Sequence, residues 1–221
     1  MRRGAEHVVR VPPFDDAAGV HDGKRPAEVA LHEEAARITD AMLTSGVELV
    51  TAAVAAGATL PSEAELAAHV TKAGIGIMYA EHADVVVVSP LAGGLVYAGA
   101  NSAYPHGLPS AYRLAPGDTF MLSLGCAVGG RFVEGERTFV LGEPTARQRR
   151  FHDAVRLAQR VGGEAIRPGA ECRAANATCL AVCATPGWGS TCGTARATGS
   201  GLACTSRRGW RTATTPCCDL A

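Results

Sequence analysis

Apolar positions in the first third of the chain follow the spacing of two helices. A helix is predicted to begin near Pro26, a favoured first-turn residue, and to stop at Gly57. Its apolar stripe consists of Val29, Ala35, Ile38, Met42, Leu49 and Val50. Ser62 and Glu65 have the spacing of a capping box, which predicts a second helix running to about Lys72.

Shorter apolar runs in the middle of the chain predict strands over residues 85–88, 120–124 and 137–141. Gly129 and Gly130 lie between the last two runs and indicate a bend or bulge. Thr145 and Gln148 form another capping box, which opens a helix to about Ile166, and Arg-Pro-Gly at 167–169 ends it. Helices, then strands, then a helix indicate an α+β domain with a curved, mostly antiparallel sheet.

Composition divides the chain near Cys172. Seven of the eight cysteines and both tryptophans lie in residues 172–221, which contain no Glu, Lys or His. We therefore expect a flexible lead-in or domain remnant over 1–23, one domain over 24–171, and a Cys-rich tail over 172–221.

Charge and hydropathy restrict the classes of partner. The 21 Lys and Arg residues balance the 21 Asp and Glu residues, so nothing favours a nucleic acid or an anionic membrane as partner. The chain has no run of about 18 apolar residues, and its basic start is not followed by the apolar core of a secretory signal. We expect a cytoplasmic protein without a transmembrane helix.

Three polar segments carry the candidate chemistry. Asn101 and His106 lie in a loop between predicted strands, and Asp118 follows a Pro-Gly turn. Glu134 and Glu136 are two apart on an extended segment and so share one face, where two carboxylates can bind a metal, share a proton or bind a cation. Taken singly, these features are typical of a solvated histidine, a turn aspartate and an ion-paired strand edge.

In combination and in order, these segments resemble the creatinase and Xaa-Pro peptidase superfamily, which includes methionine aminopeptidase. The matching positions are Asn101, His106, Gly117, Asp118, Ser123, Glu134, Arg137, Thr138 and Arg-Pro-Gly at 167–169. The resemblance implies an incomplete pita-bread domain over 24–171. It also implies a hydrolase lineage with a small peptide or amidine-type substrate, and a homodimer.

The resemblance also implies site residues. Family peptidases hold two divalent cations (Mn, Co or Zn) with two Asp, one His and two Glu. Ser123 stands in the first Asp slot, where the ligand is lost, and Glu134 is a weak metal ligand in the second. Glu136 makes the segment more similar to creatinase, which needs no metal, so His106 and Glu136 would be the catalytic and substrate-binding residues. We expect no cofactor for the chain as written.

The tail lacks the His-Gly-x-Gly and His-Glu segments that the family pattern requires next. A Cys-rich zinc or disulfide module is disfavoured, because the tail has no Cys-x-x-Cys pair and the expected compartment is reducing. A shifted reading frame is the preferred interpretation, since suitable codons for residues 197–202 encode Gly-His-Gly-Ile-Gly-Leu in the neighbouring frame. Residues after about 172 are then expected to be disordered or poorly packed.

Three functions remain open at this point. The first is a truncated and inactive hydrolase of the Xaa-Pro peptidase type. The second is a metal-independent, creatinase-like C–N hydrolase. The third is a non-catalytic remnant or binding module.

Overall fold

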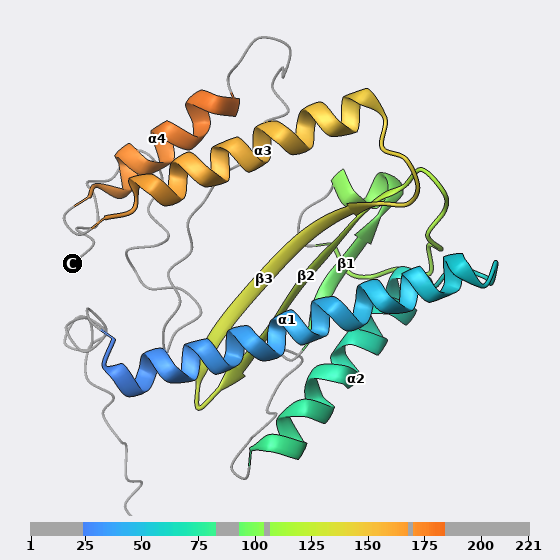
Figure 1. Ribbon diagram of the computed structural model, residues 1–221, viewed down its shortest axis with the longest axis horizontal. Coiled ribbons are helices and arrows are strands. Elements are labelled where there is room, and N and C mark those ends of the chain that lie inside the picture. The colour runs from blue at the N-terminus through green and yellow to red at the C-terminus, as the bar shows by residue number, and fades with distance from the viewer. Residues whose placement is uncertain (1–23, 83–92, 104–106, 168–169, 184–221) are drawn as a thin grey trace, which may run out of the picture.

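The computed structural model describes residues 24–82, 93–103, 107–167 and 170–183 (Figure 1). The elements are α1 (Pro26–Ala55), α2 (Glu63–Glu81), β1 (Gly93–Ala98), the 3-10 helix η2 (Gly99–Ala103), β2 (Thr119–Val128), β3 (Arg131–Val140), α3 (Ala146–Ala165) and α4 (Cys172–Cys183). The predicted strand over 85–88 lies outside the described residues, as does His106.

The first two helices form where the capping signals predict them. Pro26 occupies the first turn of α1, and Gly57, with φ of +59°, follows its end. At the start of α2 the Ser62 hydroxyl accepts from the amide of Glu65 at 3.2 Å, and the Glu65 carboxylate accepts from the amide of Ser62 at 2.9 Å. α2 runs to Glu81, beyond the predicted end, because its apolar stripe continues against α1.

The three strands form one antiparallel sheet in the order β1-β2-β3. Gly129 and Gly130, with φ of +53° and +75°, are the central residues of a two-residue hairpin turn between β2 and β3. Such a turn requires positive φ at both positions, so the predicted bend is a tight hairpin rather than a bulge. The sequence did not predict β1, a short strand that begins with two glycines.

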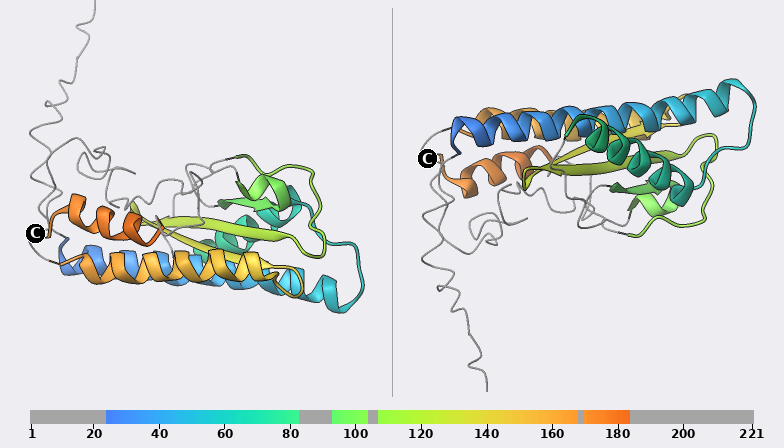
Figure 2. Two further views of the ribbon diagram at one scale, coloured as in Figure 1. Left: turned by 90° about the horizontal axis from the view of Figure 1, so that it is seen from above. Right: turned by 90° about the horizontal axis from the view of Figure 1, so that it is seen from below.

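Helices cover one face of this sheet. α1 contacts β2 and β3, α2 contacts β1, and β3 is visibly bowed (Figures 1 and 2). The core between these layers includes Ile38, Met42, Leu66, Val70, Val96, Leu122, Leu124 and Cys126. Helices and an antiparallel sheet confirm the predicted α+β class, and the opposite sheet face is left to carry polar side chains.

The third and fourth helices pack against each other. Thr145 caps α3, and the Gln148 amide donates to the Gly117 carbonyl and the Thr119 hydroxyl, both at 3.1 Å. In α4 the Cys179 thiol lies 3.5 Å from the Ala158 carbonyl of α3. After about residue 172 we expected disorder or poor packing, and Cys172–Cys183 instead form a helix whose described side chains are exposed or half-buried.

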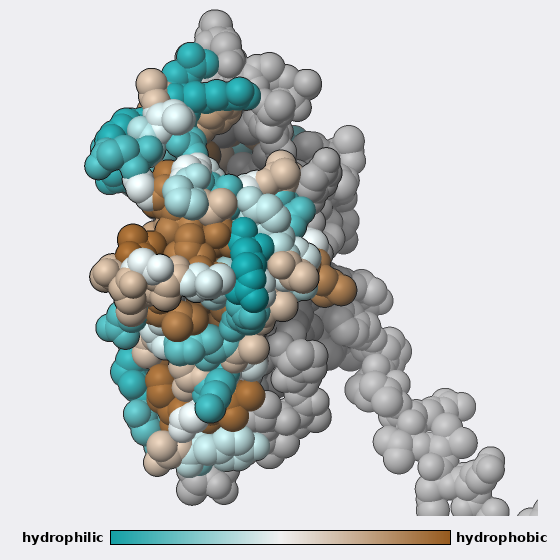
Figure 3. All heavy atoms as spheres, turned by 90° about the vertical axis from the view of Figure 1, so that its right-hand side faces the viewer, coloured by the Kyte–Doolittle hydropathy of each residue, from teal (hydrophilic) through white to brown (hydrophobic). Residues whose placement is uncertain are grey.

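Hydrophobic side chains remain on the surface of the described fold. Figure 3 shows brown patches between hydrophilic groups on the side of the molecule that lies to the right in Figure 1. Val155 on α3 and Ile166, which follows the end of α3, are exposed although both are large apolar residues. Such residues are ordinary when scattered singly and gain meaning only when they are contiguous.

Among the described residues, α1 is long and apolar enough to meet the length and composition criterion for crossing a membrane. One side of α1 is buried against α2 and the sheet, with Ile38 and Met42 fully enclosed. A core helix of a folded domain meets the same criterion, so this match is weak evidence for a span.

Candidate functional site

Three of the predicted site residues meet on the sheet face opposite α1. Ser123 on β2 lies directly across from Glu136 on β3, and Glu134 is two residues further along the same strand. The Ser123 hydroxyl donates to the Glu136 carboxylate at 2.7 Å and lies 3.3 Å from the Glu134 carboxylate. The alternation of side chains along a strand places all three on one face.

These three residues differ in their exposure to solvent. Ser123 is 5% exposed, since β1 and β3 flank it on both sides, whereas Glu134 and Glu136 are exposed. The cluster therefore combines two accessible negative charges with one neutral hydroxyl that holds Glu136 in place. Chemically it can attract a cation or a cationic group of a ligand.

The cluster does not fit a centre of two divalent metal ions. Hard divalent cations are bound mainly by carboxylate oxygens, and Ser123 offers only a neutral hydroxyl whose proton is already donated to Glu136. Among the described residues, the cluster offers two carboxylates, those of Glu134 and Glu136.

His106 lies outside the described residues, but both flanks of its segment are described, and a single carboxylate binds them. Glu63, in the first turn of α2 and 1% exposed, accepts from the Ala98 amide at 2.7 Å and from the Asn101 side-chain amide at 3.2 Å. It also accepts from the Ser110 amide at 2.9 Å and the Ser110 hydroxyl at 2.5 Å.

The charge state of Glu63 follows from these contacts. Burial by itself raises the pKa of a carboxyl group, but the hydrogen bonds from Ser110, Ala98 and Asn101 outweigh it, and the pKa of Glu63 is lowered. Its place at the amino end of α2 also favours the negative form. Glu63 is therefore a buried carboxylate that stays ionised.

Glu63 was not identified from the sequence, although a signal for it exists. It lies three, seven and eleven residues before Leu66, Val70 and Gly74, so it falls on the buried stripe of α2. A charged residue on an apolar stripe indicates a buried polar contact, because an unpaired charge there is costly.

The turn before β2 is structural, as predicted for Asp118. Its carboxylate accepts from the Ala115 amide at 2.8 Å and from the Tyr112 hydroxyl at 2.9 Å. Gly99, with φ of +53°, comes so close that an added Cβ would lie 2.6 Å from the Tyr112 hydroxyl. This turn therefore packs directly against the residue that follows β1.

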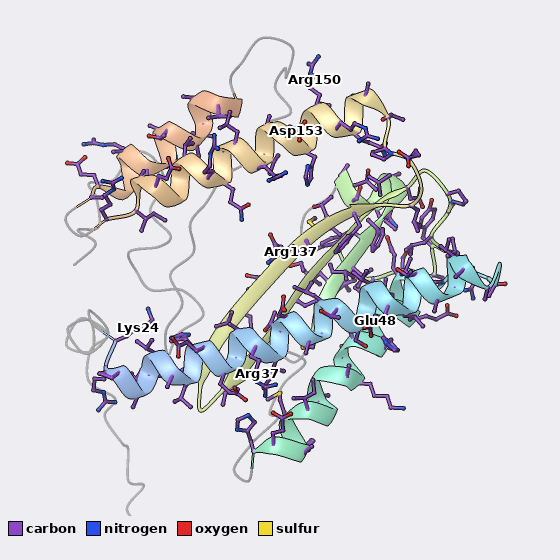
Figure 4. The ribbon with its side chains drawn as sticks, in the orientation of Figure 1. Lys24, Arg37, Glu48, Arg137, Arg150 and Asp153 are labelled. Atoms are coloured by element: carbon purple, nitrogen blue, oxygen red, sulfur yellow. The ribbon has the colours of Figure 1, made fainter. Side chains whose placement is uncertain are left out.

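A second titratable cluster joins α1 to α2, on the helical side of the fold. Ligand atoms of Glu34, Glu81 and His82 lie within 4.8 Å of one another. Arg37, labelled in Figure 4, pairs with both Glu34 and Glu81. The guanidinium bridges the two carboxylates, so the arrangement is an interhelical ion-pair network.

Comparison with known proteins places the chain in a family. The model of metallopeptidase family M24 matches residues 30–208. Xaa-Pro dipeptidase of Pyrococcus furiosus is 29% identical over 146 residues, which are 66% of this chain and 38% of that protein. Xaa-Pro dipeptidase of Lactobacillus delbrueckii subsp. lactis is 35% identical over 75 residues, which are 34% of this chain and 20% of that protein.

Solved structures show the same fold. Prolidase from Pyrococcus furiosus matches 89% of this chain and 53% of its own, with a TM-score of 0.73 and 23% identity. X-Pro aminopeptidase from Thermotoga maritima matches 92% of this chain and 54% of its own, with a TM-score of 0.73 and 20% identity. The chain thus has part of a pita-bread domain and spans well under two thirds of these relatives. It belongs to metallopeptidase family M24.

Proposed function

We propose that this chain is part of the catalytic domain of an Xaa-Pro peptidase-type hydrolase whose two-metal centre is incomplete. The observation that carries the proposal is the 2.7 Å hydrogen bond from Ser123 to Glu136. At Ser123 the family pattern has a metal-binding aspartate, and the serine instead holds a neighbouring carboxylate. The named activity of the relatives, Xaa-Pro dipeptidase, supports a small peptide as the ancestral substrate.

We infer that the chain as written does not cleave Xaa-Pro bonds through divalent metal ions. The loss of one carboxylate removes negative charge that would offset two adjacent cations, and a serine hydroxyl does not replace it. His106 and Glu136 remain the residues proposed for proton transfer and for binding a cationic group.

A metal-independent, creatinase-like C–N hydrolase is a second candidate, and the geometry of the cluster favours it. Glu134 and Glu136 are exposed on one face, and Glu136 is fixed by Ser123. Two accessible carboxylates match the forked donors of a guanidinium group. The carboxylates of Glu134 and Glu136 would then bind a cationic substrate, whereas carboxylates at this place in the peptidases bind metal ions.

Assays on the purified chain test both proposals. Equilibrium dialysis against Mn²⁺, Co²⁺ and Zn²⁺ should show fewer than two bound ions per chain, and a Xaa-Pro dipeptide should remain uncleaved. Two bound ions together with cleavage would refute the incomplete centre. Metal-free hydrolysis of creatine that is lost in Glu136→Gln would establish the second candidate.

A non-catalytic role is the third candidate, and the same assays separate it. A binding module would be indicated if creatine or guanidinium binds to the chain without being hydrolysed and if this binding is lost in Glu136→Gln. Failure to bind either ligand or any metal would indicate a remnant.

We also propose that the reading frame changes after about Val182. The described fold continues through α4 to Cys183, and the family segments missing from the tail reappear in the neighbouring frame when suitable codons are chosen. Sequencing the gene in all three frames decides this, and a neighbouring frame without His-Gly-x-Gly and His-Glu would refute it.

Homodimerisation and a cytoplasmic location complete the proposal. Both rest on the resemblance to the Xaa-Pro peptidase superfamily. Sedimentation velocity of the purified chain tests the first, and fractionation of the source cells tests the second.

A further inference from the structure

β3 is an edge strand of the sheet, and one side of its backbone has no strand beside it. The sheet order is β1-β2-β3, so among the described residues β2 is the only strand that pairs with β3 (Figure 1). Over its ten residues, Arg131–Val140, β3 therefore carries a row of amides and carbonyls that points away from β2. An unpaired strand edge of this length is a template for another extended chain.

The hairpin turn determines which residues form this outer row. The two-residue turn closes with Val128 and Arg131 as a hydrogen-bonded pair. Hydrogen-bonded and non-hydrogen-bonded pairs alternate along an antiparallel ladder, so every second residue of β3 turns its amide and carbonyl outward. These residues are Phe132, Glu134, Glu136, Thr138 and Val140. The Glu136 carbonyl agrees with this assignment, because it accepts from the Arg137 side chain at 2.7 Å.

The outer row carries two acidic side chains, Glu134 and Glu136. Both are exposed, and they lie two residues apart on the sheet face that also holds Ser123. A strand added beside β3 would place alternate side chains opposite these carboxylates and on the same face. Lys or Arg at those alternate positions would form two cross-strand ion pairs, whereas Asp or Glu there would be repelled.

A second copy of β3 is a poor occupant of this edge. In antiparallel pairing the outward residues of the two strands meet, so registers near full overlap would set Glu134 and Glu136 opposite or diagonal to the same carboxylates of the second copy. Like charges so placed are destabilising. Arg137, labelled in Figure 4, also covers the Glu136 carbonyl, as charged side chains do at protected sheet edges. The edge therefore favours a cationic strand over self-association.

We propose that the outer edge of β3 binds an extended peptide as an antiparallel fourth strand, with basic side chains opposite Glu134 and Glu136. This rests on the binding-module candidate for the function and names its partner, but it requires neither hydrolysis nor a metal ion. The backbone row supplies hydrogen bonds to any extended chain, and the two carboxylates select a basic one. The competing explanation is that the carboxylates attract any cationic group without a strand being formed.

NMR of the isotopically labelled whole chain tests the proposal with a blocked peptide, acetyl-Val-Lys-Val-Lys-Val-Thr-amide. We expect the amides of Glu134, Glu136 and Thr138 to shift downfield and to exchange more slowly with solvent, because they gain hydrogen bonds. The amides of Val133 and Gly135 already face β2 and should move much less. Equal shifts in the two rows of amides, or no shifts in either, would overturn the proposal.

Two modified peptides separate strand addition from simple attraction of charge. N-methylation of both Lys amides keeps the positive charges but removes the donors that face β3, so binding should weaken at least about tenfold. Glu in place of both Lys residues keeps the donors but reverses the charge, and should also weaken binding at least about tenfold. If either modified peptide bound as tightly as the parent peptide, the proposal would be wrong.

Thr138→Pro tests the same edge from the protein side. Proline is tolerated where an edge strand turns its amide outward, so the ladder with β2 should remain while one donor is lost. We expect the affinity for the Lys peptide to fall at least about fivefold. Glu48→Gln, at an exposed glutamate of α1, is the control and should leave this affinity unchanged (Figure 4). If Thr138→Pro does not fold, Glu134→Gln keeps the backbone and removes one carboxylate, and should weaken binding at least about threefold.

Unchanged affinity in the folded variant would contradict the proposal. Sedimentation velocity without peptide tests the other occupant, a second copy of the chain. We expect the same oligomeric state in Thr138→Pro as in the natural chain. A dimer that becomes a monomer in Thr138→Pro would show that a second copy occupies the edge, and would overturn the proposal. Absence of hydrolysis by the chain would count against the enzymatic candidates and leave these results intact.

Discussion

Ser123 and Glu136 face each other across β2 and β3, and the serine hydroxyl donates to the glutamate carboxylate at 2.7 Å. Under the proposed function, Ser123 stands where the family pattern has an aspartate, which would add a third negative charge. The open face of the sheet therefore presents two exposed carboxylates, those of Glu134 and Glu136, beside a buried neutral hydroxyl. The following predictions test this site and the fold that supports it.

Restoring an acid at position 123 should create affinity for divalent metal ions. Ser123→Asp places a third carboxylate beside Glu134 and Glu136, and carboxylate oxygens are the preferred ligands of hard cations. We expect Mn²⁺ to bind at least about tenfold more tightly, which corresponds to about 1.4 kcal/mol. Isothermal titration calorimetry measures the Mn²⁺ affinity of both chains. Ser123→Asn is the matched neutral control, and equal Mn²⁺ affinity in both variants would contradict a role for the lost charge.

Removing a buried leucine from the central strand should destabilise the domain. Leu122 is fully buried between β2 and α1, so Leu122→Ala leaves a cavity and is expected to lower the free energy of unfolding by about 2–5 kcal/mol. Urea denaturation followed by circular dichroism gives the value. Leu108→Ala, at a side chain that is 84% exposed, should change it by less than about 0.5 kcal/mol. Similar losses in the two variants would mean that the packing described for β2 is wrong.

The cap of α3 should contribute measurably to stability. The Thr145 hydroxyl accepts from the Gln148 amide at 3.2 Å, and Gln148 in turn holds the turn before β2. Thr145→Ala leaves that amide without its partner, so the free energy of unfolding should fall by about 1 kcal/mol. Thr51→Ala, on the exposed side of α1, is the control in the same urea titration. An effect no larger than that of the control would show that α3 does not depend on its cap.

The interhelical ion pairs should make stability depend on acidity. Hydrogen bonding to Arg37, and then to His82, lowers the pKa of Glu34 from 4.5 to about 2. A lowered pKa means that the contribution is complete above about pH 4.5 and is lost as pH falls toward 2.

Glu34→Gln removes this pH-dependent contribution. Its Tm should be about 1–3 °C below that of the natural chain at pH 7, as expected for a partly exposed pair, and the two values should converge near pH 2. Glu33→Gln, a neighbouring exposed position, is the control in the same calorimetric series. A Tm difference that stays constant from pH 7 to pH 2 would contradict the ion-pair account.

Local patterns in the sequence were sufficient for the helices and for part of the site. Pro26, Ser62 and Thr145 marked helix starts correctly, because a cap depends on residues within one turn of the chain. Glu134 and Glu136 could be assigned to one face for a similar reason, since strand alternation is local. The motifs spaced along the chain also identified the family, which the match over residues 30–208 confirms.

The contacts that define the site depend on pairing between distant segments, and only the tertiary structure decided them. Ser123 meets Glu136 because the two-residue turn at Gly129 and Gly130 fixes the register of β2 and β3. The predicted bend or bulge there leaves the register undetermined, since the extra residue of a bulge would reverse which side chains share a face. Glu63 gains its partners 35 to 47 residues further along the chain, and no local periodicity encodes a contact of that range. The sequence by itself thus determined which residues could carry the chemistry, whereas strand register and helix packing decided which of them meet.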